Sequence, residues 1–149
     1  DCVLGNSIVL ANNSALAGHV VIKDNVTIGG LSGVHQFCRI GQGAMIGAVS
    51  MVTNDVLPYA IVLGERASFG GLNLIGLKRQ GASQDIINSI KKTYELLFDP
   101  SSNFKDQAAS LLENGVENEW IEIVLDFVLS DTTRSFVTPK KNKASHHNE

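Results

Sequence analysis

Two histidines, a carboxylate, an amide and a glycine recur at related spacings near the start of the chain. Asp1 and His19 are 18 residues apart, as are Gly18 and Gln36, and His35 directly precedes Gln36. Imidazole side chains can transfer protons or bind a metal ion. If residues 18 apart lie side by side, these five residues converge on one edge of the molecule. A lone surface histidine is usually structural or solvated, but this combination makes the edge a candidate site.

A six-residue repeat explains the spacing. Nine branched aliphatic residues stand at every sixth position, and a small or aliphatic residue follows four places after each. A period of six fits neither an amphipathic helix nor an ordinary hairpin sheet. It is typical of a hexapeptide parallel β-helix, with one short strand and one turn per hexad. The repeated aliphatic residues are Leu4, Leu10, Leu16, Ile22, Ile28, Val34, Ile40, Ile46 and Val52.

Three hexads make one coil, so residue i is expected to lie beneath residue i+18. The aliphatic residue at each hexad start should point inward, and the small residue at the fifth place, such as Cys38, should fit a tight corner. His19 stands at the fourth place, in the outward part of its hexad. Glycine and asparagine are expected to supply the unusual backbone angles of the turns, at Gly5, Asn6, Asn12, Asn13, Gly29, Gly30 and Gly41.

The composition predicts a soluble intracellular protein. The chain has 149 residues and a formal net charge of −3, and it lacks the basic stripe that a nucleic-acid-binding protein would need. Cys2 and Cys38 are too few for a disulfide framework, and no apolar run reaches the roughly 18 residues of a membrane span. The sequence has no initiator methionine and begins in mid-repeat, so we expect further coils to precede Asp1.

The chain divides into four segments by pattern. We expect three coils over 1–57, a Gly-rich connector over 58–82, a helical domain over 83–136 and a polar, disordered tail over 137–149. The repeat stops at Pro58, and the connector is apolar enough to be an ordered arm on the coil end or on a neighbouring subunit. Ser83 resembles an N-cap, and apolar periodicity predicts helices over about 84–98, 104–113 and 116–130.

Four strings resemble the UDP-N-acetylglucosamine acyltransferase family: Ala-Gly-His (17–19), Gly-Gly-Leu-Ser-Gly-Val-His-Gln-Phe (29–37), Asp-Val-Leu-Pro-Tyr (55–59) and Asn-Leu-Ile-Gly-Leu-Lys-Arg (73–79). The resemblance implies a mainly β fold, a left-handed parallel β-helix followed by a small helical domain. It also implies a cytoplasmic homotrimer of a Gram-negative bacterium with active sites between adjacent β-helices. Such enzymes transfer an (R)-3-hydroxyacyl chain from acyl carrier protein to the glucosamine 3-hydroxyl of UDP-N-acetylglucosamine, with no metal or organic cofactor.

The resemblance also implies roles for individual residues. The general base of the family is a histidine immediately before an Asp-Cys pair, which here would precede Asp1. Asp1 would orient that base, and the Gly18 N–H would hold the oxyanion. His19 would contact the sugar nucleotide and support catalysis. Further contacts to the nucleotide sugar or the acyl group are implied for Gly30, His35 and Gln36, and contacts to the nucleotide from the neighbouring subunit for Asn73 and Arg79.

Some positions depart from the family pattern. Ile75 replaces a carboxylate found in some members, and Gln80 replaces a second arginine, which weakens the detailed picture of the nucleotide contacts. Ala48 stands where glycine permits long acyl chains and methionine limits them to shorter ones. Arg66 stands where long-chain enzymes can carry a histidine at the end of the acyl pocket. Ala48 and Arg66 therefore form a candidate acyl-chain ruler, a pair of residues that would set the length of the bound acyl chain. Alanine at position 48 suggests an intermediate or long chain.

Three other functions stay open. A zinc protein resembling the γ-carbonic anhydrases would need three histidines at subunit boundaries, and the coils supply only His19 and His35. A purely structural or binding solenoid is the second alternative, which the Gly-rich arm and the polar edge argue against. The third is the related N-acyltransferase of the same pathway, in which we would expect a shorter helical tail.

Overall fold

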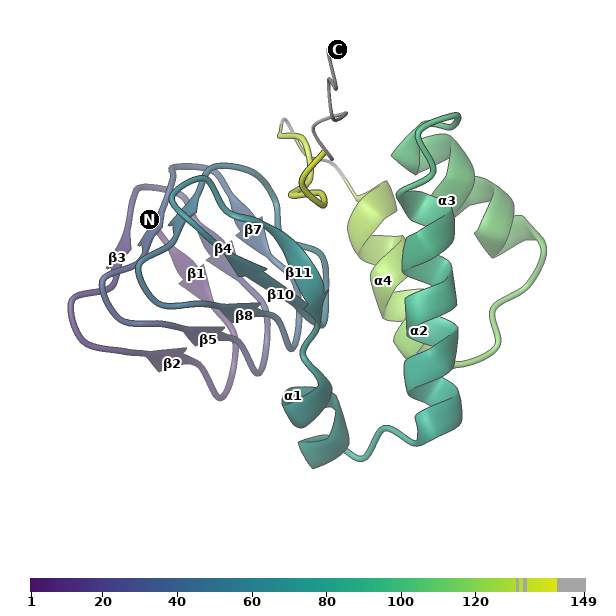
Figure 1. Cartoon of the computed structure of the whole chain (residues 1–149), viewed down its shortest axis with the longest axis horizontal. Helices are drawn as coiled ribbons and strands as arrows, with labels where there is room; N and C mark the ends of the chain where they lie inside the picture. The colour runs from purple at the N-terminus through teal and green to yellow at the C-terminus, as the bar shows by residue number, and fades with distance from the viewer. Residues whose placement is uncertain (131, 133, 142–149) are drawn as a thin grey trace, which may run out of the picture.

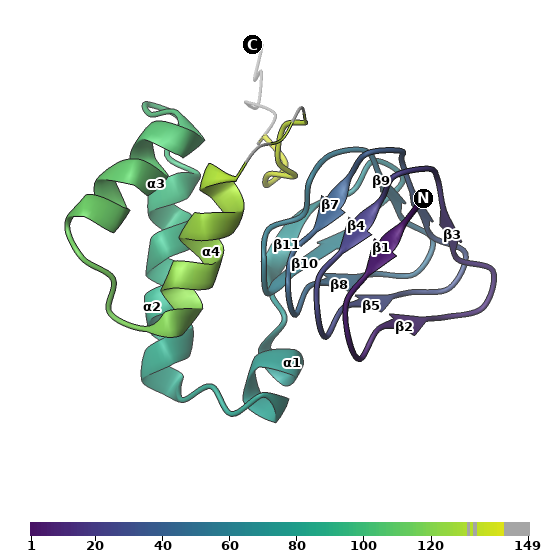
Figure 2. The ribbon, with the colours of Figure 1, turned by 180° about the vertical axis from the view of Figure 1, so that it is seen from behind.

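The computed structural model describes residues 1–130, 132 and 134–141, and all structural statements refer to these residues. They form two units side by side, a β-solenoid and a group of helices (Figure 1). The segment after the last helix returns to lie between the two units, as Figure 1 and Figure 2 both show. No helix in this part of the chain is both long and apolar enough to cross a membrane.

The first coils form a three-faced prism. Each residue of a strand pairs in parallel with the residue 18 positions later, as Val3 does with Val21. The repeat therefore predicted the parallel solenoid and its register correctly. One face holds β1 (Val3–Leu4), β4 (Val21–Ile22) and β7 (Arg39–Ile40), the second starts with β2 (Val9–Leu10), β5 (Thr27–Ile28) and β8 (Met45–Ile46), and the third holds β3 (Ala15–Leu16), β6 (Gly33–Val34) and β9 (Met51–Val52).

The hexad-start aliphatic residues fill the inside of the prism. From Ile22 to Val52 each is at most 3% exposed, and the fifth-place residues from Val20 to Val56 are buried beside them. Branched side chains suit such a stack because they have few rotamers to lose on burial. Burial raises the pKa of the Cys38 thiol to about 11. The thiol therefore stays protonated and acts as the small buried apolar group that its position predicts.

The turns differ from the expectation. The left-handed residue is the fourth of each hexad, and of the predicted turn residues only Asn13 is among them; the set is Ser7, Asn13, His19, Asn25, Leu31, Phe37, Gly43 and Val49. From Asn25 onward the N–H at this place bonds to a carbonyl 19 residues earlier, as from Phe37 to Gly18 at 3.0 Å; in the first coil the carbonyl just before the left-handed residue accepts that bond. These main-chain bonds hold the stacked turns together and do not depend on the side chain. Gly29 serves close approach instead, since a Cβ there would lie 2.5 Å from the backbone nitrogen of Ala48.

The connector is ordered and packs on the end of the solenoid. Strand β10 (Ala60–Leu63) continues the second face by pairing in parallel with β8, and β11 (Ser68–Leu72) returns antiparallel to it. The parallel pairing thus continues past residue 57, although its offset shortens from 18 to 16 residues, as between Met45 and Ile61. A short helix, α1 (Leu74–Arg79), then follows. Sequence periodicity missed it because six residues are too few to show a helical pattern.

The helical unit contains α2 (Gln84–Leu97), α3 (Phe104–Glu113) and α4 (Glu119–Leu129). Side chains cap all three N-termini, from Ser83, Asn103 and Asn118. The predicted N-cap is confirmed, because the Ser83 hydroxyl accepts from the Ile86 N–H at 3.2 Å. Each helix lies within the range expected for it. Helix α4 begins at Glu119 rather than 116, because the Asn118 side chain accepts from the Ile121 N–H and sets the start there.

A buried ion pair joins the solenoid to the helices. Asp55 is 0% exposed and accepts from Arg39 Nε at 2.8 Å and from the Arg39 backbone N–H at 2.9 Å. The Arg39 guanidinium also donates to the Phe127 carbonyl in α4 at 3.2 Å and lies 4.3 Å from the centre of its ring. The Asp55 backbone bonds to Ser135 and Val137 on the returning segment. One carboxylate therefore anchors the coil, α4 and the end of the described chain.

The returning segment extends the ordered part beyond the expected boundary at residue 137. Val137 is 3% exposed, and the Thr138 carbonyl accepts from the Phe69 N–H at 3.0 Å. This segment is held because its backbone pairs with the coil end, which no local sequence pattern reveals. The rest of the predicted polar tail, residues 142–149, lies outside the described residues.

We expect Asp55→Ala to destabilise the fold by about 3–5 kcal/mol, because removing one partner leaves the Arg39 charge poorly compensated. The free energy of unfolding is measured by urea denaturation followed by circular dichroism. Asp126→Ala, which removes an exposed carboxylate of α4, is the matched control and should change stability by less than about 0.5 kcal/mol. Equal effects of the two substitutions would show that the ion pair does not anchor the units.

Candidate functional site

One corner of the prism carries four of the predicted site residues. Gly18 and His19 lie in the turn between β3 and β4, and His35 and Gln36 lie in the equivalent turn one coil later, between β6 and β7. The bond from the Phe37 N–H to the Gly18 carbonyl holds the two turns together. All four residues are exposed. The structure therefore gathers two imidazoles, an amide and a glycine on one accessible edge.

His19 is held by stacking. Its ring lies parallel to that of Phe37, with centroids 4.8 Å apart and 2° between the planes. Both residues have left-handed backbones at equivalent places in successive coils, so the register itself superposes the rings. Stacking fixes the plane of the imidazole and leaves the nitrogens at its edge accessible. Within the described residues, no side chain or backbone group bonds to these nitrogens.

His35 is held by a side-chain hydrogen bond from a distant part of the chain. Arg134 Nη2 lies 2.9 Å from His35 Nδ1. Arg134 Nη1 donates to the Thr53 carbonyl at 2.9 Å, one coil above His35. The two imidazoles are therefore fixed in different ways, one by an aromatic ring and one by a guanidinium.

Gly18 has a free backbone donor. Its N–H has no partner among the described residues, and a Cβ at this position would have nothing within 4 Å. An N–H of this kind can stabilise a developing negative charge on a substrate oxygen. The same place in the next coil, Gln36, also leaves its N–H without a backbone partner in this part of the chain. The free donor is thus a property of the turn that Gly18 and Gln36 share, and the assignment of Gly18 as the oxyanion donor stays a prediction from the family resemblance.

Asp1 lies at the start of the His19 column. It precedes Val3 by two residues, as His19 precedes Val21, and Val3 pairs with Val21. Cys2 Sγ donates to the Ala17 carbonyl at 3.2 Å, which ties the start of the chain to the turn that carries Gly18 and His19. The register therefore supports the prediction that Asp1 belongs to this corner.

The predicted acyl-chain ruler, Ala48 and Arg66, lies at a second corner together with the predicted substrate contact Gly30. Gly30 and Ala48 occupy stacked turns, because the Val49 N–H bonds to the Gly30 carbonyl at 2.9 Å. Arg66 lies in the turn between β10 and β11, which the bond from the Ala67 N–H to the Met51 carbonyl brings next to β9. Ala48 and Arg66 are exposed, and Gly30 is partly buried. The face formed by β3, β6 and β9 separates this corner from the histidines.

The predicted nucleotide residues lie beside the third corner. Asn73 and Arg79 line a groove of about 720 Å³ together with Ser7 and Asn25. The Asn73 amide also has a structural role, since it caps α1 by accepting from the Gly76 N–H at 3.1 Å and donates to the Gly43 carbonyl at 3.0 Å. Arg79 is exposed in the last turn of α1. Ile75 and Gln80 line the same groove.

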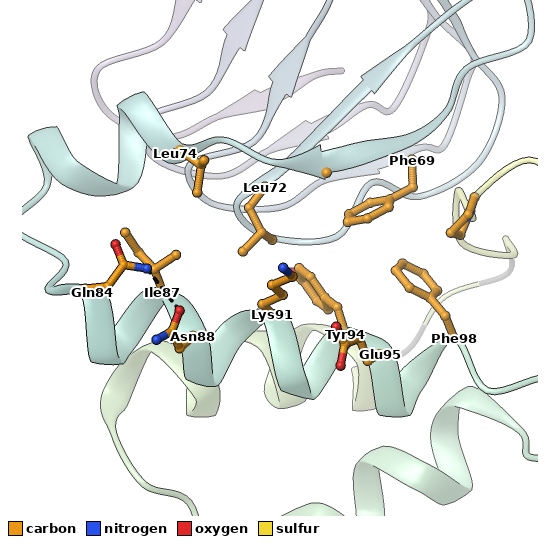
Figure 3. A pocket seen from close by; sticks show the side chains of 12 residues that line it. Phe69, Leu72, Leu74, Gln84, Ile87, Asn88, Lys91, Tyr94, Glu95 and Phe98 are labelled. Carbon is orange, nitrogen blue, oxygen red and sulfur yellow. Dashed lines mark hydrogen bonds between the residues drawn. The ribbon is translucent and has the colours of Figure 1, made fainter.

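A further groove, of about 620 Å³, lies between β11 and α2 and holds none of the predicted site residues (Figure 3). Phe69 and Leu72 face Tyr94 and Phe98 across it, as Figure 3 shows. The Tyr94 hydroxyl donates to the Pro58 carbonyl, and burial raises the pKa of that hydroxyl well above its usual range. The groove is mostly apolar, with Lys91 and Glu95 also on its lining, and it lies apart from the predicted site residues.

The described residues contain no group of three or more histidine, cysteine or acidic side chains arranged to hold a metal ion. His19 and His35 are the two histidines among these residues, and Nδ1 of His35 is in contact with the Arg134 guanidinium. The donor set in this part of the chain thus does not fit the tetrahedral zinc site of the γ-carbonic anhydrase alternative. Proton transfer and hydrogen bonding are the chemistry that the corner can support.

Sequence reasoning missed Arg134 and the role of Phe37. Phe37 could have been found, because it shares the column of His19. Arg134 could not, since it lies 99 residues from His35 in a segment without periodicity.

Comparisons with known proteins agree with this architecture. Residues 55–137 match the family model described as Udp N-acetylglucosamine O-acyltransferase, domain 2. The chain is 51% identical over 140 residues to the acyl-[acyl-carrier-protein]–UDP-N-acetylglucosamine O-acyltransferase of Paracoccus denitrificans, covering 93% of this chain and 52% of that protein. It is 44% identical to the protein of that name from Nautilia profundicola, covering 87% of this chain and 50% of that protein.

Solved structures give the same result. The UDP-N-acetylglucosamine acyltransferase from Campylobacter jejuni superposes with a TM-score of 0.85 at 38% identity, covering 94% of this chain and 54% of that one. The Arabidopsis enzyme superposes with a TM-score of 0.82 at 35% identity, covering 92% of this chain and 50% of that one. The chain spans about half the length of the curated relatives that it matches. By sequence and by structure, the chain belongs to the UDP-N-acetylglucosamine O-acyltransferase family.

Proposed function

We propose that the intact protein transfers an (R)-3-hydroxyacyl chain from acyl carrier protein to the 3-hydroxyl of UDP-N-acetylglucosamine, the first step of lipid A biosynthesis, in the bacterial cytoplasm. The observation that carries the proposal is the corner that holds Gly18, His19 and His35 in a chain of this family. The relatives named above are O-acyltransferases, which favours a hydroxyl acceptor over the amine used by the related N-acyltransferase.

The proposed reaction is attack of the sugar hydroxyl on the thioester carbonyl. A general base, which the family resemblance puts immediately before Asp1, takes the hydroxyl proton, and Asp1 orients that base. The carbonyl oxygen becomes an oxyanion that the free Gly18 N–H stabilises. The tetrahedral intermediate then collapses to the ester, the C–S bond breaks, and the protonated base returns the proton so that the carrier leaves as a thiol. His19, held flat by Phe37, contacts the sugar nucleotide next to the reacting atoms.

A homotrimer is part of the proposal because the predicted residues are divided among three corners of one prism. The histidines, the pair Gly30 and Ala48, and the groove of Arg79 lie on different edges. One small substrate cannot reach all three edges of a single chain. Closed symmetric assembly would bring the Arg79 edge of one copy to the histidine edge of the next. Ala48 and Arg66 would then border the end of the acyl chain, which we expect to be intermediate or long.

We expect His19→Asn to lower kcat/KM by roughly 10- to 1,000-fold, as for loss of a polar group near the reacting atoms. Asparagine tolerates the left-handed backbone at this position, so the fold should survive the change. Acyl-transfer kinetics with both substrates measure the loss, and thermal unfolding checks the fold. A folded variant with wild-type rates would remove His19 from the site.

We expect Arg79→Ala to raise KM for the nucleotide sugar by roughly 10- to 150-fold, because a charge-assisted hydrogen bond to phosphate contributes about 1.5–3 kcal/mol. The KM for acyl carrier protein should change much less. Lys78→Ala is the matched control, since Lys78 is an exposed neighbour that does not line the groove. A raised KM for the carrier with an unchanged KM for the nucleotide would mean that Arg79 binds the acidic carrier instead.

We expect mixed trimers to recover activity when His19→Asn chains are co-expressed with Arg79→Ala chains. With random assembly, about a quarter of the sites would combine an intact His19 with an intact Arg79 from the next copy. Activity of purified mixed trimers is compared with that of each variant alone. If mixing gave only the average of the two variants, His19 and Arg79 would not serve one shared site.

A further inference from the structure

We propose that Arg134 is a positioning residue that fixes His35 as a hydrogen-bond donor to the substrate through Nε2. The inference deepens the proposed function and rests on it for the identity of the substrate. It concerns a residue from the far end of the described chain, outside all the motifs that carry the family resemblance.

Two contacts of His35 Nδ1 bear on which nitrogen carries the proton. The Gln36 carbonyl oxygen lies 3.5 Å away, longer than a normal hydrogen bond, so the shorter contact with Arg134 decides the assignment. Arg134 Nη2 lies 2.9 Å from His35 Nδ1. A guanidinium stays protonated and has only N–H donors, so Nδ1 must be the acceptor. A neutral imidazole that accepts at Nδ1 carries its proton on Nε2. In this state His35 Nε2 offers an N–H, and it cannot take a proton from the sugar hydroxyl.

Arg134 is itself held by the anchor between the two units. Its Nη1 donates to the Thr53 carbonyl at 2.9 Å, and its backbone N–H donates to Thr132 Oγ1 at 3.1 Å. The Thr132 hydroxyl in turn donates to Asp55 Oδ2 at 2.6 Å, and Asp55 forms the buried pair with Arg39. The guanidinium therefore approaches His35 from a fixed direction.

The surroundings fit this role better than a purely structural one. Arg134 Nε is buried and has no partner among the described residues, and an unsatisfied buried donor is costly. His35 is exposed, so its contact with Arg134 covers little apolar surface. The arrangement directs one edge of the imidazole to the arginine and leaves the other edge accessible. The group that fits Nε2 is an oxygen acceptor, such as a hydroxyl, carbonyl or phosphate oxygen of the nucleotide sugar or the acyl group.

The tautomer can be read directly by NMR of the intact protein labelled with 15N-histidine. Wild-type His35 should give the pattern of a single tautomer protonated at Nε2, without any substrate present. Arg134→Met should convert it to a mixture of tautomers, while the His19 pattern stays unchanged as an internal control. Arg134→Lys keeps a charged donor and should retain the single tautomer protonated at Nε2; a mixture of tautomers in a folded lysine variant would contradict the role of the donor. A wild-type His35 protonated at Nδ1 would overturn the proposal.

Kinetics separate positioning from a structural role. His35→Gln places an amide N–H near the position of Nε2 and should keep most of the activity, whereas His35→Asn places its amide near Nδ1 and should lower kcat/KM by roughly 10- to 100-fold. Arg134→Met should lower kcat/KM in the wild-type background but hardly further in the His35→Asn background, because it acts through His35. Equal losses in both backgrounds would reduce Arg134 to a structural residue. An inactive wild type with the expected tautomer would contradict only the proposed function.

Discussion

The backbone hydrogen bonds between successive coils are the constraint on which the rest of the structure depends. They hold each residue beside the one 18 positions later, both in the strands and through the turns. Because the bonds involve only main-chain groups, the same turn occurs at residues as different as Asn25, Leu31 and Val49, whose N–H groups donate these bonds. A left-handed backbone is unfavourable for most of these side chains. The ladder overrides that preference, and it thereby frees the fourth place of each hexad for residues such as His19 and Phe37.

The Arg39–Asp55 pair connects the solenoid to the helices and to the returning segment. A buried carboxylate is costly unless it is paired and hydrogen-bonded, and here both of its oxygens are satisfied by Arg39 and Thr132. The same residue joins the returning segment through its backbone. The anchor and the candidate site are therefore connected, because Thr132 bonds to Asp55 on one side and to the Arg134 backbone on the other.

The geometry of a prism explains why the candidate site is divided. Each corner is a stack of turns with outward-facing groups, and a flat sheet separates it from the next corner. Residues on different corners can therefore act on one substrate only where two prisms come together. This is why we propose that the histidine edge of one copy contacts the reacting carbonyl while the Arg79 groove of another copy binds the phosphates. The product of the proposed reaction, with a nucleotide at one end and an acyl chain at the other, would suit such an extended boundary.

The sequence by itself determined the coil register, because a six-residue period leaves only one way to stack the aliphatic residues from Ile22 to Val52 inside. That register was enough to place His19 beside Phe37 and Gly18 beside Gln36. The sequence also predicted the three long helices, because apolar periodicity and N-caps are local features.

Only the tertiary structure decided which residues hold the turns, where the connector packs and what contacts His35. The left-handed turns recur at one place of each hexad and are stacked by main-chain bonds between residues 19 positions apart, so glycine and asparagine content did not locate them. Helix α1 is too short to show a period. The contact between Arg134 and His35 joins residues 99 positions apart. It exists because the Asp55 anchor brings the end of the chain back to the coil, a long-range event that no local pattern in the sequence can encode.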